Sequence, residues 1–368
     1  MTQLLNSPPI QQSTGVTGQL LNVLEDIVHK VEIHSDFSIR HPDYKPLELL
    51  TEVVARFQQL PEQMQQKYLS LQLRSFLYGI YYNGSMRSTL ALDGEENGLN
   101  LDLENNTLLG VDIAFYQQLH ESNCGEGYFD PGWSVLKEET DGTLAVTKGS
   151  LRLHIKRDKH LHPAEKSAAV GELVAIRMPK NLVQNGFYMA VGNAGVQSQQ
   201  HLQKPQQIVR IYFNLTPSGT VEVMGNLTQQ LNAISIGFSF KVLYNPGDYK
   251  RYDSGVLYFE KRDYEAVSEV LQAVYQQKES HFKSEVPLFT KQLAPGLGLA
   301  EEPDQKFGVQ ESFGMNRCQI VANGLLKAWH QGDDSPEVRM QAILGQFSHL
   351  GIDLQRPYLN ANSEDIYQ

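Results

Sequence analysis

The sequence predicts an α+β protein in which a helical N-terminal subdomain is followed by a mostly antiparallel sheet with flanking helices. Over the first ~140 residues, apolar residues recur every three or four positions, which is the spacing of amphipathic helices. Between residues 151 and 259, several short segments alternate apolar and polar residues, which is typical of half-buried strands. Because helices are expected mainly before and after these strands, an alternating βαβ fold is disfavoured.

The charge balance of the chain restricts its partners. There are 31 Lys and Arg residues against 42 Asp and Glu residues, so the formal net charge is −11. This excess of negative charge argues against nucleic acids and anionic membranes as main partners. A local basic cleft remains compatible with it.

Two further observations bear on the compartment. The two cysteines, Cys124 and Cys318, are too few for a disulfide framework, which suits a reducing environment. The sequence has no run of about 18 apolar residues and no basic segment leading into an apolar one at its start. We therefore expect a cytoplasmic protein that does not enter the membrane.

The chain is expected to divide into four segments. These are a flexible tail at 1–17, a helical subdomain at 18–142, an α+β domain at 143–355 and a polar tail at 356–368.

Within the helical subdomain, periodic apolar residues predict helices at 19–31 and 108–120. Pro46 and Pro61 fit the first turns of two further helices, because proline is tolerated there. The stretch 121–142, which is rich in glycine, is expected to be an irregular connection.

The strands of the α+β domain are predicted from alternation. Apart from the segment at 151–156, they lie at 172–178, 186–192, 207–214, 238–244 and 254–260. The turn signal Pro217-Ser218-Gly219 predicts a hairpin made of 209–215 and 219–224.

The last third of the chain is predicted to be largely helical. Asp263 is expected to cap a helix that reaches about Gln277. Helices are also predicted at 312–330 and 335–349. Between them, 287–303 holds too many glycines for a regular element.

Several common site motifs are weak in this sequence. The glycines at 192–195 and 296–298 lack the spacing and flanking elements of a nucleotide loop. His160 and His162 lie in a lysine-rich stretch without paired cysteines or carboxylates, so solvated loop histidines are favoured over a metal site. No nucleophile elbow is present.

Cations on the predicted strands form the most informative pattern. Arg152 and His154 alternate with apolar residues in 151–156, Arg177 does so in 174–178, and Lys241 in 238–242. In 209–214 the polar row consists of Arg210, Tyr212 and Asn214. If these strands share one sheet, one face is core and the other carries cations and one imidazole. We expect such a face to bind an anionic, phosphorylated substrate.

A plainer interpretation stays open, because half-solvated strands normally present Arg and Lys outward. Two features favour a site. Cations flank His154 two residues away on either side, an arrangement that a bound anion would stabilise. The expected face also contains almost no carboxylates, although Asp253 could orient the neighbouring Arg251.

Residues 150–330 resemble the HopA-type effector family, first named from plant-pathogen type III effectors. The segments that carry the resemblance are VRIYFNLTPSG (209–219), LTQQLNAISIGFSFKVLYNP (227–246), YKRYDSGVLYF (249–259), PLFTKQLAPGLGLAEEP (287–303) and SFGMNRC (312–318). The N-terminal helices are similar only in character, through FLYGIYYN.

The resemblance implies an activity. Family members in bacterial biosynthetic clusters look like the lyase of class V lanthipeptide and thioamitide systems, which acts after a separate peptide kinase. The implied reaction is elimination of phosphate from phosphoserine or phosphothreonine in a precursor peptide, giving dehydroalanine or dehydrobutyrine. It needs no metal or organic cofactor. Type III effector phosphothreonine lyases use a Lys base and a His acid in a Lys-x-His pattern, where this chain has Arg152-Leu153-His154.

On this model of the reaction, each candidate residue has an expected role. Lys241 is the first choice for the base and Lys180 the second, while His154 is the acid. The expected phosphate ligands are Arg152, Arg177, Arg210, Arg251 and Arg317. Asn214, Tyr212 and Asp253 are expected to support them.

Other interpretations stay open for single residues and for the whole chain. Arg317 could be a helix surface residue, Arg251 could only pair with Asp253, and both Tyr212 and Tyr258 could be strand packing. The chain could also be a non-catalytic phosphopeptide-binding or effector-like interaction protein. A third possibility is a scaffold in a biosynthetic complex.

Overall fold

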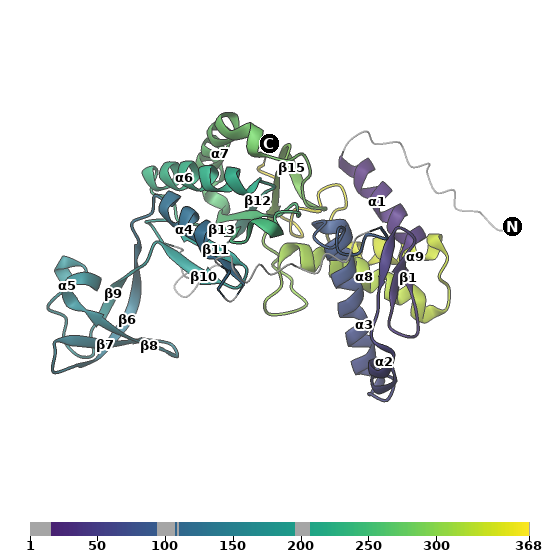
Figure 1. The fold of residues 1–368 in the computed structure, drawn as a ribbon, viewed down its shortest axis with the longest axis horizontal. Coiled ribbons are helices and arrows are strands. Elements are labelled where there is room, and N and C mark those ends of the chain that lie inside the picture. Colours follow the sequence, from purple (N-terminus) through teal and green to yellow (C-terminus); the bar gives the residue numbers. More distant parts are fainter. Residues whose placement is uncertain (1–15, 94–106, 109, 196–206, 368) are drawn as a thin grey trace. The chain divides into compact units, whose positions relative to one another are not determined.

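The computed structural model describes residues 16–93, 107–108, 110–195 and 207–367 (Figure 1). Most of the expected tail at 1–17 lies outside these residues. Helices and antiparallel sheets make up the described chain, so the predicted α+β class is confirmed. None of the described helices has the length and apolar content needed to cross a bilayer.

The chain folds into two compact units whose boundaries differ from the expected ones. Unit 1 consists of Met1–Asn97, Pro287–Lys291 and Ala300–Gln368. Unit 2 consists of Gly98–Val286 and Gln292–Leu299. The N-terminal helices thus share a unit with the C-terminal part of the chain instead of forming a subdomain with residues up to 142.

Unit 1 is mainly helical. Its helices are α1 (Val16–Lys30), α2 (Thr51–Phe57), α3 (Glu62–Leu77) with the π-helical turn η1 (Tyr78–Tyr82), α8 (Phe313–Gln331) and α9 (Pro336–His349). A small sheet holds β1 (Glu32–Ile33), β2 (Ile39–His41) and β3 (Tyr44–Leu47). Pro46 lies in β3, so the helix expected to start there begins only at Thr51.

Long-range contacts join the two ends of unit 1. Helix α3 packs against α8, and α1 packs against α9. Arg339 on α9 is buried and donates hydrogen bonds to the backbone carbonyls of Val28 and Val31 at the end of α1. These carbonyls have no partner within their own helix, so the arginine satisfies groups that would otherwise be buried and unpaired.

Residues 356–367 are also part of unit 1 and do not form a free polar tail. Tyr358, Leu359 and Tyr367 are buried there. The buried carboxylate of Glu301 accepts hydrogen bonds from the Tyr367 hydroxyl and the Ser363 hydroxyl, both at 2.8 Å. A charge-assisted network of this kind fixes the segment to the strand that carries Glu301.

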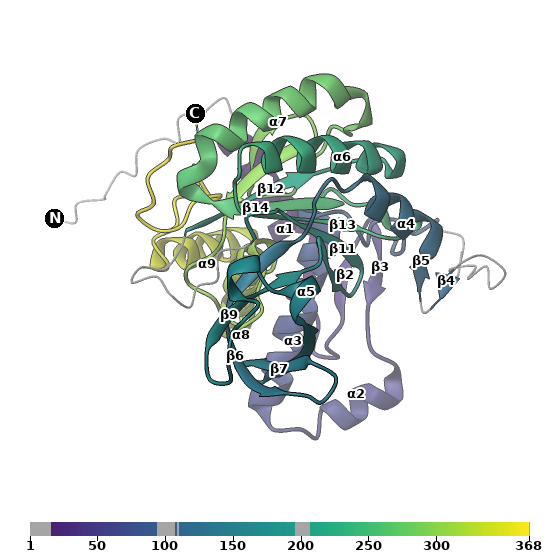
Figure 2. The ribbon, with the colours of Figure 1, turned by 90° about the vertical axis from the view of Figure 1, so that its left-hand side faces the viewer.

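Unit 2 is built on an antiparallel sheet with the strand order β10-β11-β13-β14-β12-β16-β15. The strands are β10 (Asn181–Gln184), β11 (Phe187–Val191), β12 (Ile208–Phe213), β13 (Phe238–Leu243), β14 (Gly255–Glu260), β15 (Lys291–Ala294) and β16 (Leu297–Glu301). Helices α6 (Pro217–Ala233) and α7 (Tyr264–Lys278) lie together over one face of this sheet (Figure 2). Helix α4 (Ile113–Ser122) packs beside α6 and β11.

Two predictions for this region are wrong. The expected hairpin at 209–224 is a strand followed by helix α6, because the Thr216 side chain caps the helix and Pro217 occupies its first turn. The expected irregular segment at 287–303 contains strands β15 and β16, with Gly296 at a φ of +71° in the turn between them. The glycine allows that turn.

A smaller antiparallel sheet, also in unit 2, has the order β8-β7-β6-β9. Its strands are β6 (Tyr128–Glu138), β7 (Thr143–Lys148), β8 (Leu151–Lys156) and β9 (Leu173–Met178), so 121–142 is not irregular as expected. One face has its own core, made of Trp133, Val135, Leu144, Val146, Ile155, Leu161, Ala168, Val174 and Ile176. The short helix α5 (Arg157–His160) follows β8.

The packing of α8 against α9 makes a prediction about stability. A Cβ on Gly324 of α8 would lie 2.6 Å from the Ile343 Cα, whereas a Cβ on Gly345 of α9 would meet nothing within 4 Å. We expect Gly324→Ala to lower the free energy of unfolding by about 1–3 kcal/mol through overpacking. Gly345→Ala should raise it by about 0.5–1 kcal/mol through helix propensity. Chemical denaturation followed by circular dichroism measures both, and equal effects of the two changes would contradict this account of the packing.

Candidate functional site

The register of three central strands places four polar side chains on one face of the seven-stranded sheet. Tyr258 on β14 is directly opposite Arg210 on β12, and Tyr212 and Lys241 are both opposite Val256. Directly opposed residues, and residues two apart on one strand, share a face. One face of the sheet therefore carries Arg210, Tyr212, Tyr258 and Lys241, and we call it the Arg210–Lys241 face. Phe213 lies on the other face, where its ring contacts Phe282, and Phe282 contacts Tyr275 of α7.

The aromatic ring of Tyr258 lies between the two cations of this face. The Arg210 Cζ is 5.0 Å from the centre of the Tyr258 ring, and the Lys241 Nζ is 5.5 Å from it. The same Nζ is 4.6 Å from the centre of the Phe187 ring. Arg210 and Lys241 thus stand on strands that are two spacings of about 4.8 Å apart, with β14 between them.

Lys241 is held by aromatic rings rather than by carboxylates. It is half-buried, and its side chain forms no ion pair and no hydrogen bond with any residue that the structure describes. Cation–π contacts offset only part of the cost of removing an ammonium group from water. The arrangement therefore favours an anion beside Lys241.

The Arg210–Lys241 face ends at Asn214, directly after β12. Its amide nitrogen donates to the Glu285 carbonyl at 2.9 Å, while its buried Oδ1 has no hydrogen-bond partner among the described residues. Nearby, the amide of Lys283 donates to the Asn214 carbonyl, and the Lys283 Nζ donates to the Tyr249 carbonyl. Burial lowers the pKa of the Lys283 ammonium group. Sequence reasoning missed Lys283, since no pattern distinguishes it in HFKSEVP.

The expectation that all the cationic strands share one sheet is wrong. Arg152 and His154 lie on β8, and Arg177 lies on β9, which belong to the four-stranded sheet. Arg210 and Lys241 belong to the seven-stranded sheet. The roles predicted for the individual residues stay predictions, but the single face that was to unite them does not exist.

Within the four-stranded sheet, Arg152, His154 and Arg177 do share the face opposite to its core. His154 is opposite Ala145, and Arg152 is opposite Thr147, whereas Leu144 and Val146 point to the core. Arg177 is anchored, because its guanidinium donates to the Glu126 carbonyl at 2.9 Å.

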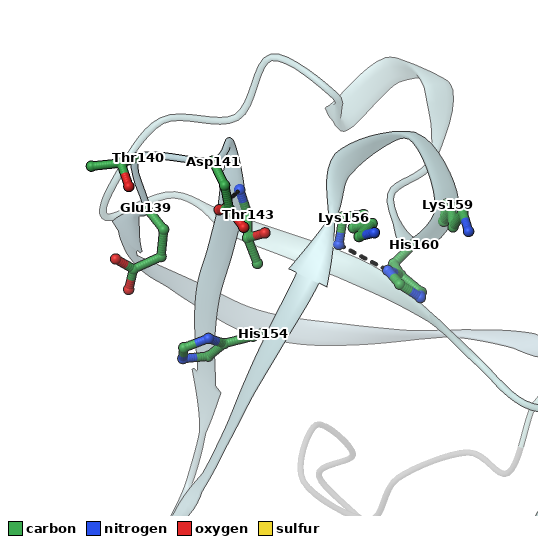
Figure 3. A pocket seen from close by; sticks show the side chains of 8 residues that line it. All are labelled: Glu139, Thr140, Asp141, Thr143, His154, Lys156, Lys159 and His160. Carbon is green, nitrogen blue, oxygen red and sulfur yellow. Dashed lines mark hydrogen bonds between the residues drawn. The ribbon is translucent and has the colours of Figure 1, made fainter.

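His154 lines an open hollow of about 860 Å³ at one end of this face (Figure 3). The other lining residues are Glu139, Thr140, Asp141, Thr143, Lys156, Lys159 and His160. The hollow thus mixes cations with two carboxylates. Among the described residues, no three His, Cys, Asp or Glu side chains are grouped so that they could hold a metal ion.

Two other predicted cations are held by partners of their own. Arg251 forms a two-pronged ion pair with the buried carboxylate of Asp253, at 2.5 and 2.8 Å. Lys180 lies in the link from β9 to β10, and its Nζ donates to the Asn123 carbonyl at 2.8 Å. Both contacts position the cation, and neither by itself assigns it to a substrate.

Arg317 is buried on α8 in unit 1, with 1% of its surface exposed. Its guanidinium donates to the carbonyls of Pro357 and Leu359, both at 2.8 Å, and to the side chain of Asn316. This arginine is therefore not a surface residue, and its predicted role as a phosphate ligand stays a prediction. It anchors the C-terminal segment.

That anchoring can be tested by replacing the arginine. We expect Arg317→Met to lower the free energy of unfolding by about 3 kcal/mol, because two buried carbonyls lose their donors. The segment after 356 should become sensitive to protease, as read by mass spectrometry of the fragments. The matched control is Arg356→Ala, since Arg356 is exposed and its side chain bonds to nearby Asp353. Wild-type stability in Arg317→Met would contradict this role.

The fold and the Arg210–Lys241 face define an α+β protein whose central antiparallel sheet carries cations on one face. Residues 178–359 match the model of the HopA1 effector protein family, so this part of the chain belongs to that family. The match starts at the last residue of β9 and spans the whole seven-stranded sheet and helices α8 and α9.

Two solved structures resemble the chain. One is an effector protein from Pseudomonas syringae pv. tomato strain DC3000, with 17% identity and a TM-score of 0.39 over 68% of this chain and 81% of that one. The other is an effector protein from Pseudomonas syringae pv. syringae strain 61, with 14% identity, the same TM-score and the same coverage. None of the curated protein sequences matches the chain.

Proposed function

We propose that this protein eliminates phosphate from phosphoserine or phosphothreonine residues of a peptide, and that the Arg210–Lys241 face holds the reacting residue. The proposal takes up the activity implied by the resemblance to the lyases of modified-peptide biosynthesis. The protein would act after a separate kinase has phosphorylated the precursor peptide. The observation that carries it is the half-buried Lys241 ammonium group, which has two aromatic rings but no carboxylate beside it among the described residues.

The reaction requires a base and a group that neutralises the leaving phosphate. The Lys241 side chain acts as the base that takes the proton from Cα of the phosphorylated residue. The electrons of that C–H bond form the Cα=Cβ double bond, and the Cβ–O bond breaks as phosphate leaves with its electron pair. The products are a dehydroamino acid and inorganic phosphate. The charge that builds up on the leaving oxygens falls beside Arg210.

The surroundings of Lys241 suit this chemistry. The rings of Phe187 and Tyr258 pack on its amine and reduce its contact with water. Exclusion of water strengthens the attraction between the phosphate and Arg210. Arg210 can form two parallel hydrogen bonds to one phosphate, which a lysine cannot.

A second candidate function is non-catalytic binding of a phosphopeptide on the same face. It is favoured by the distribution of the other cations, because Arg177, Arg251 and Lys180 all have partners within the protein. His154, the expected acid, lies on the other sheet. A binding protein needs only Arg210 and Lys241 to hold the phosphate.

Mass spectrometry of a synthetic phosphothreonine peptide incubated with the protein decides between these functions. We expect the peptide to lose about 98 Da, the mass of phosphoric acid, because elimination breaks the C–O bond. A loss of about 80 Da would indicate hydrolysis and an unchanged peptide would indicate a binding protein, and either outcome contradicts the lyase.

Variants of Lys241 sharpen the test. Lys241→Ala and Lys241→Arg should each slow phosphate release by about 10²–10⁴-fold, because neither offers an amine base. Lys241→Arg keeps the charge, so it should still bind the phosphopeptide. The matched control is Lys278→Ala, a lysine on α7 that pairs with Glu222 at 2.6 Å and lies away from this face. Full activity in Lys241→Arg would rule out its role as the base.

A further inference from the structure

Strand β8 is an edge strand whose outer side is open. In the order β8-β7-β6-β9 it pairs only with β7. The amide of Lys156 points away from β7, because it donates to the His160 ring at 2.9 Å (Figure 3). Peptide groups two residues apart on a strand point the same way. Those of Arg152 and His154 therefore face outward, and they have no hydrogen-bond partner among the described residues.

The opposite edge of the same sheet is closed. Ile176 on β9 forms a bridge with Leu161, and the amide of Ala175 donates to the Glu165 carboxylate at 3.0 Å. The chain thus covers one edge with its own residues. It leaves open only the short stretch of β8 before the His160 ring.

The side chains of β8 specify what could pair with it. Leu151 is 63% exposed and Leu153 36% exposed on one face, although both are apolar. On the other face Arg152 has no ion pair among the described residues, and His154 stands next to it. The carboxylates of the hollow, Glu139 and Asp141, belong to the end near Lys156 rather than to the end near Arg152.

We infer that the outer edge of β8 binds an extended peptide segment in which acidic residues alternate with apolar ones. The segment adds a fifth strand to the sheet through the peptide groups of Arg152 and His154. Its acidic side chains lie beside Arg152 and His154, and its apolar ones cover Leu151 and Leu153. The alternation of Arg152 and His154 with the exposed Leu151 and Leu153 identifies the occupant as an acidic peptide.

The inference rests on the proposed function in one respect, since it takes the occupant to be an unreactive part of the peptide substrate. Binding at β8 would then raise the local concentration of the phosphorylated residue at the other sheet. The four-stranded sheet lies almost wholly before the residues that match the family model.

Fluorescence anisotropy of the full-length protein with a labelled, unphosphorylated peptide of alternating valine and glutamate tests the edge directly. We expect saturable binding that Arg152→Glu weakens about tenfold or more. The control is Lys166→Glu, an exposed charge reversal on the connection before β9, which should bind like the wild type. The same peptide with every backbone amide N-methylated has no N–H left to pair with a strand edge, so it should not bind.

A backbone variant separates pairing from charge. His154→Pro removes an amide that faces outward and leaves the ladder to β7 intact, as proline on an edge strand does. It should lose binding, whereas His154→Ala, which keeps the amide, should retain it within about threefold. Equal binding of the methylated and unmethylated peptides by the wild type would overturn the inference, and so would absence of binding.

The two proposals fail separately. Lys241→Ala should bind the unphosphorylated peptide like the wild type, because β8 lies on another sheet. Peptide binding without any phosphate release would overturn the proposed lyase and leave the edge as a peptide site. The edge site alone would be overturned if the wild type releases phosphate and Arg152→Glu changes neither peptide binding nor phosphate release from a long acidic phosphopeptide.

Discussion

The pairing of β14 with both β12 and β13 is the constraint on which the candidate site depends. Because β14 lies between the two strands, the Tyr258 ring contacts both Arg210 and Lys241. Side chains alternate between faces along a strand, so a shift of one residue in the register of either strand pair would point one of the two cations towards the core. The apolar residues between them prevent this slip, since Ile211, Phe240 and Leu257 are fully buried on the opposite face.

Four strands of this sheet, β11, β12, β13 and β14, could be predicted to within about two residues because alternation is a local property of the sequence. The strands β10, β15 and β16 were not predicted. The sheet that each strand joins is not local. Residues 151–156 and 238–242 have the same pattern of apolar and cationic residues, yet they lie in different sheets. The error at 217 has a local cause instead. Thr216 caps helix α6 and Pro217 occupies its first turn. In the sequence, Pro217 together with Ser218 and Gly219 also has the composition of a turn, so the two possibilities are hard to tell apart.

The positions and bonding partners of the arginines show why the candidate site was only partly predictable. Arg317 bonds to carbonyls 40 and 42 residues away, and no spacing rule connects these positions. A signal for its burial was nevertheless present, because α8 is apolar around most of its circumference and such helices lie inside proteins. Arg251 and Asp253 are two residues apart, so that pairing could be foreseen. The row Arg210, Tyr212 and Asn214 follows from alternation alone.

The interleaved composition of unit 1 has a consequence for synthesis of the protein. The end of α1 is completed by Arg339, which bonds to Val28 from 311 positions later in the chain. The apolar stripe of α1 contains Leu24, Ile27 and Val28, all buried in the finished fold. During translation this stripe leaves the ribosome early, but α9, against which it packs, is synthesised much later. Unit 2 is translated between them and can fold before α9 is made. We therefore expect the nascent N-terminal helix to need a chaperone that covers its exposed apolar surface until translation ends.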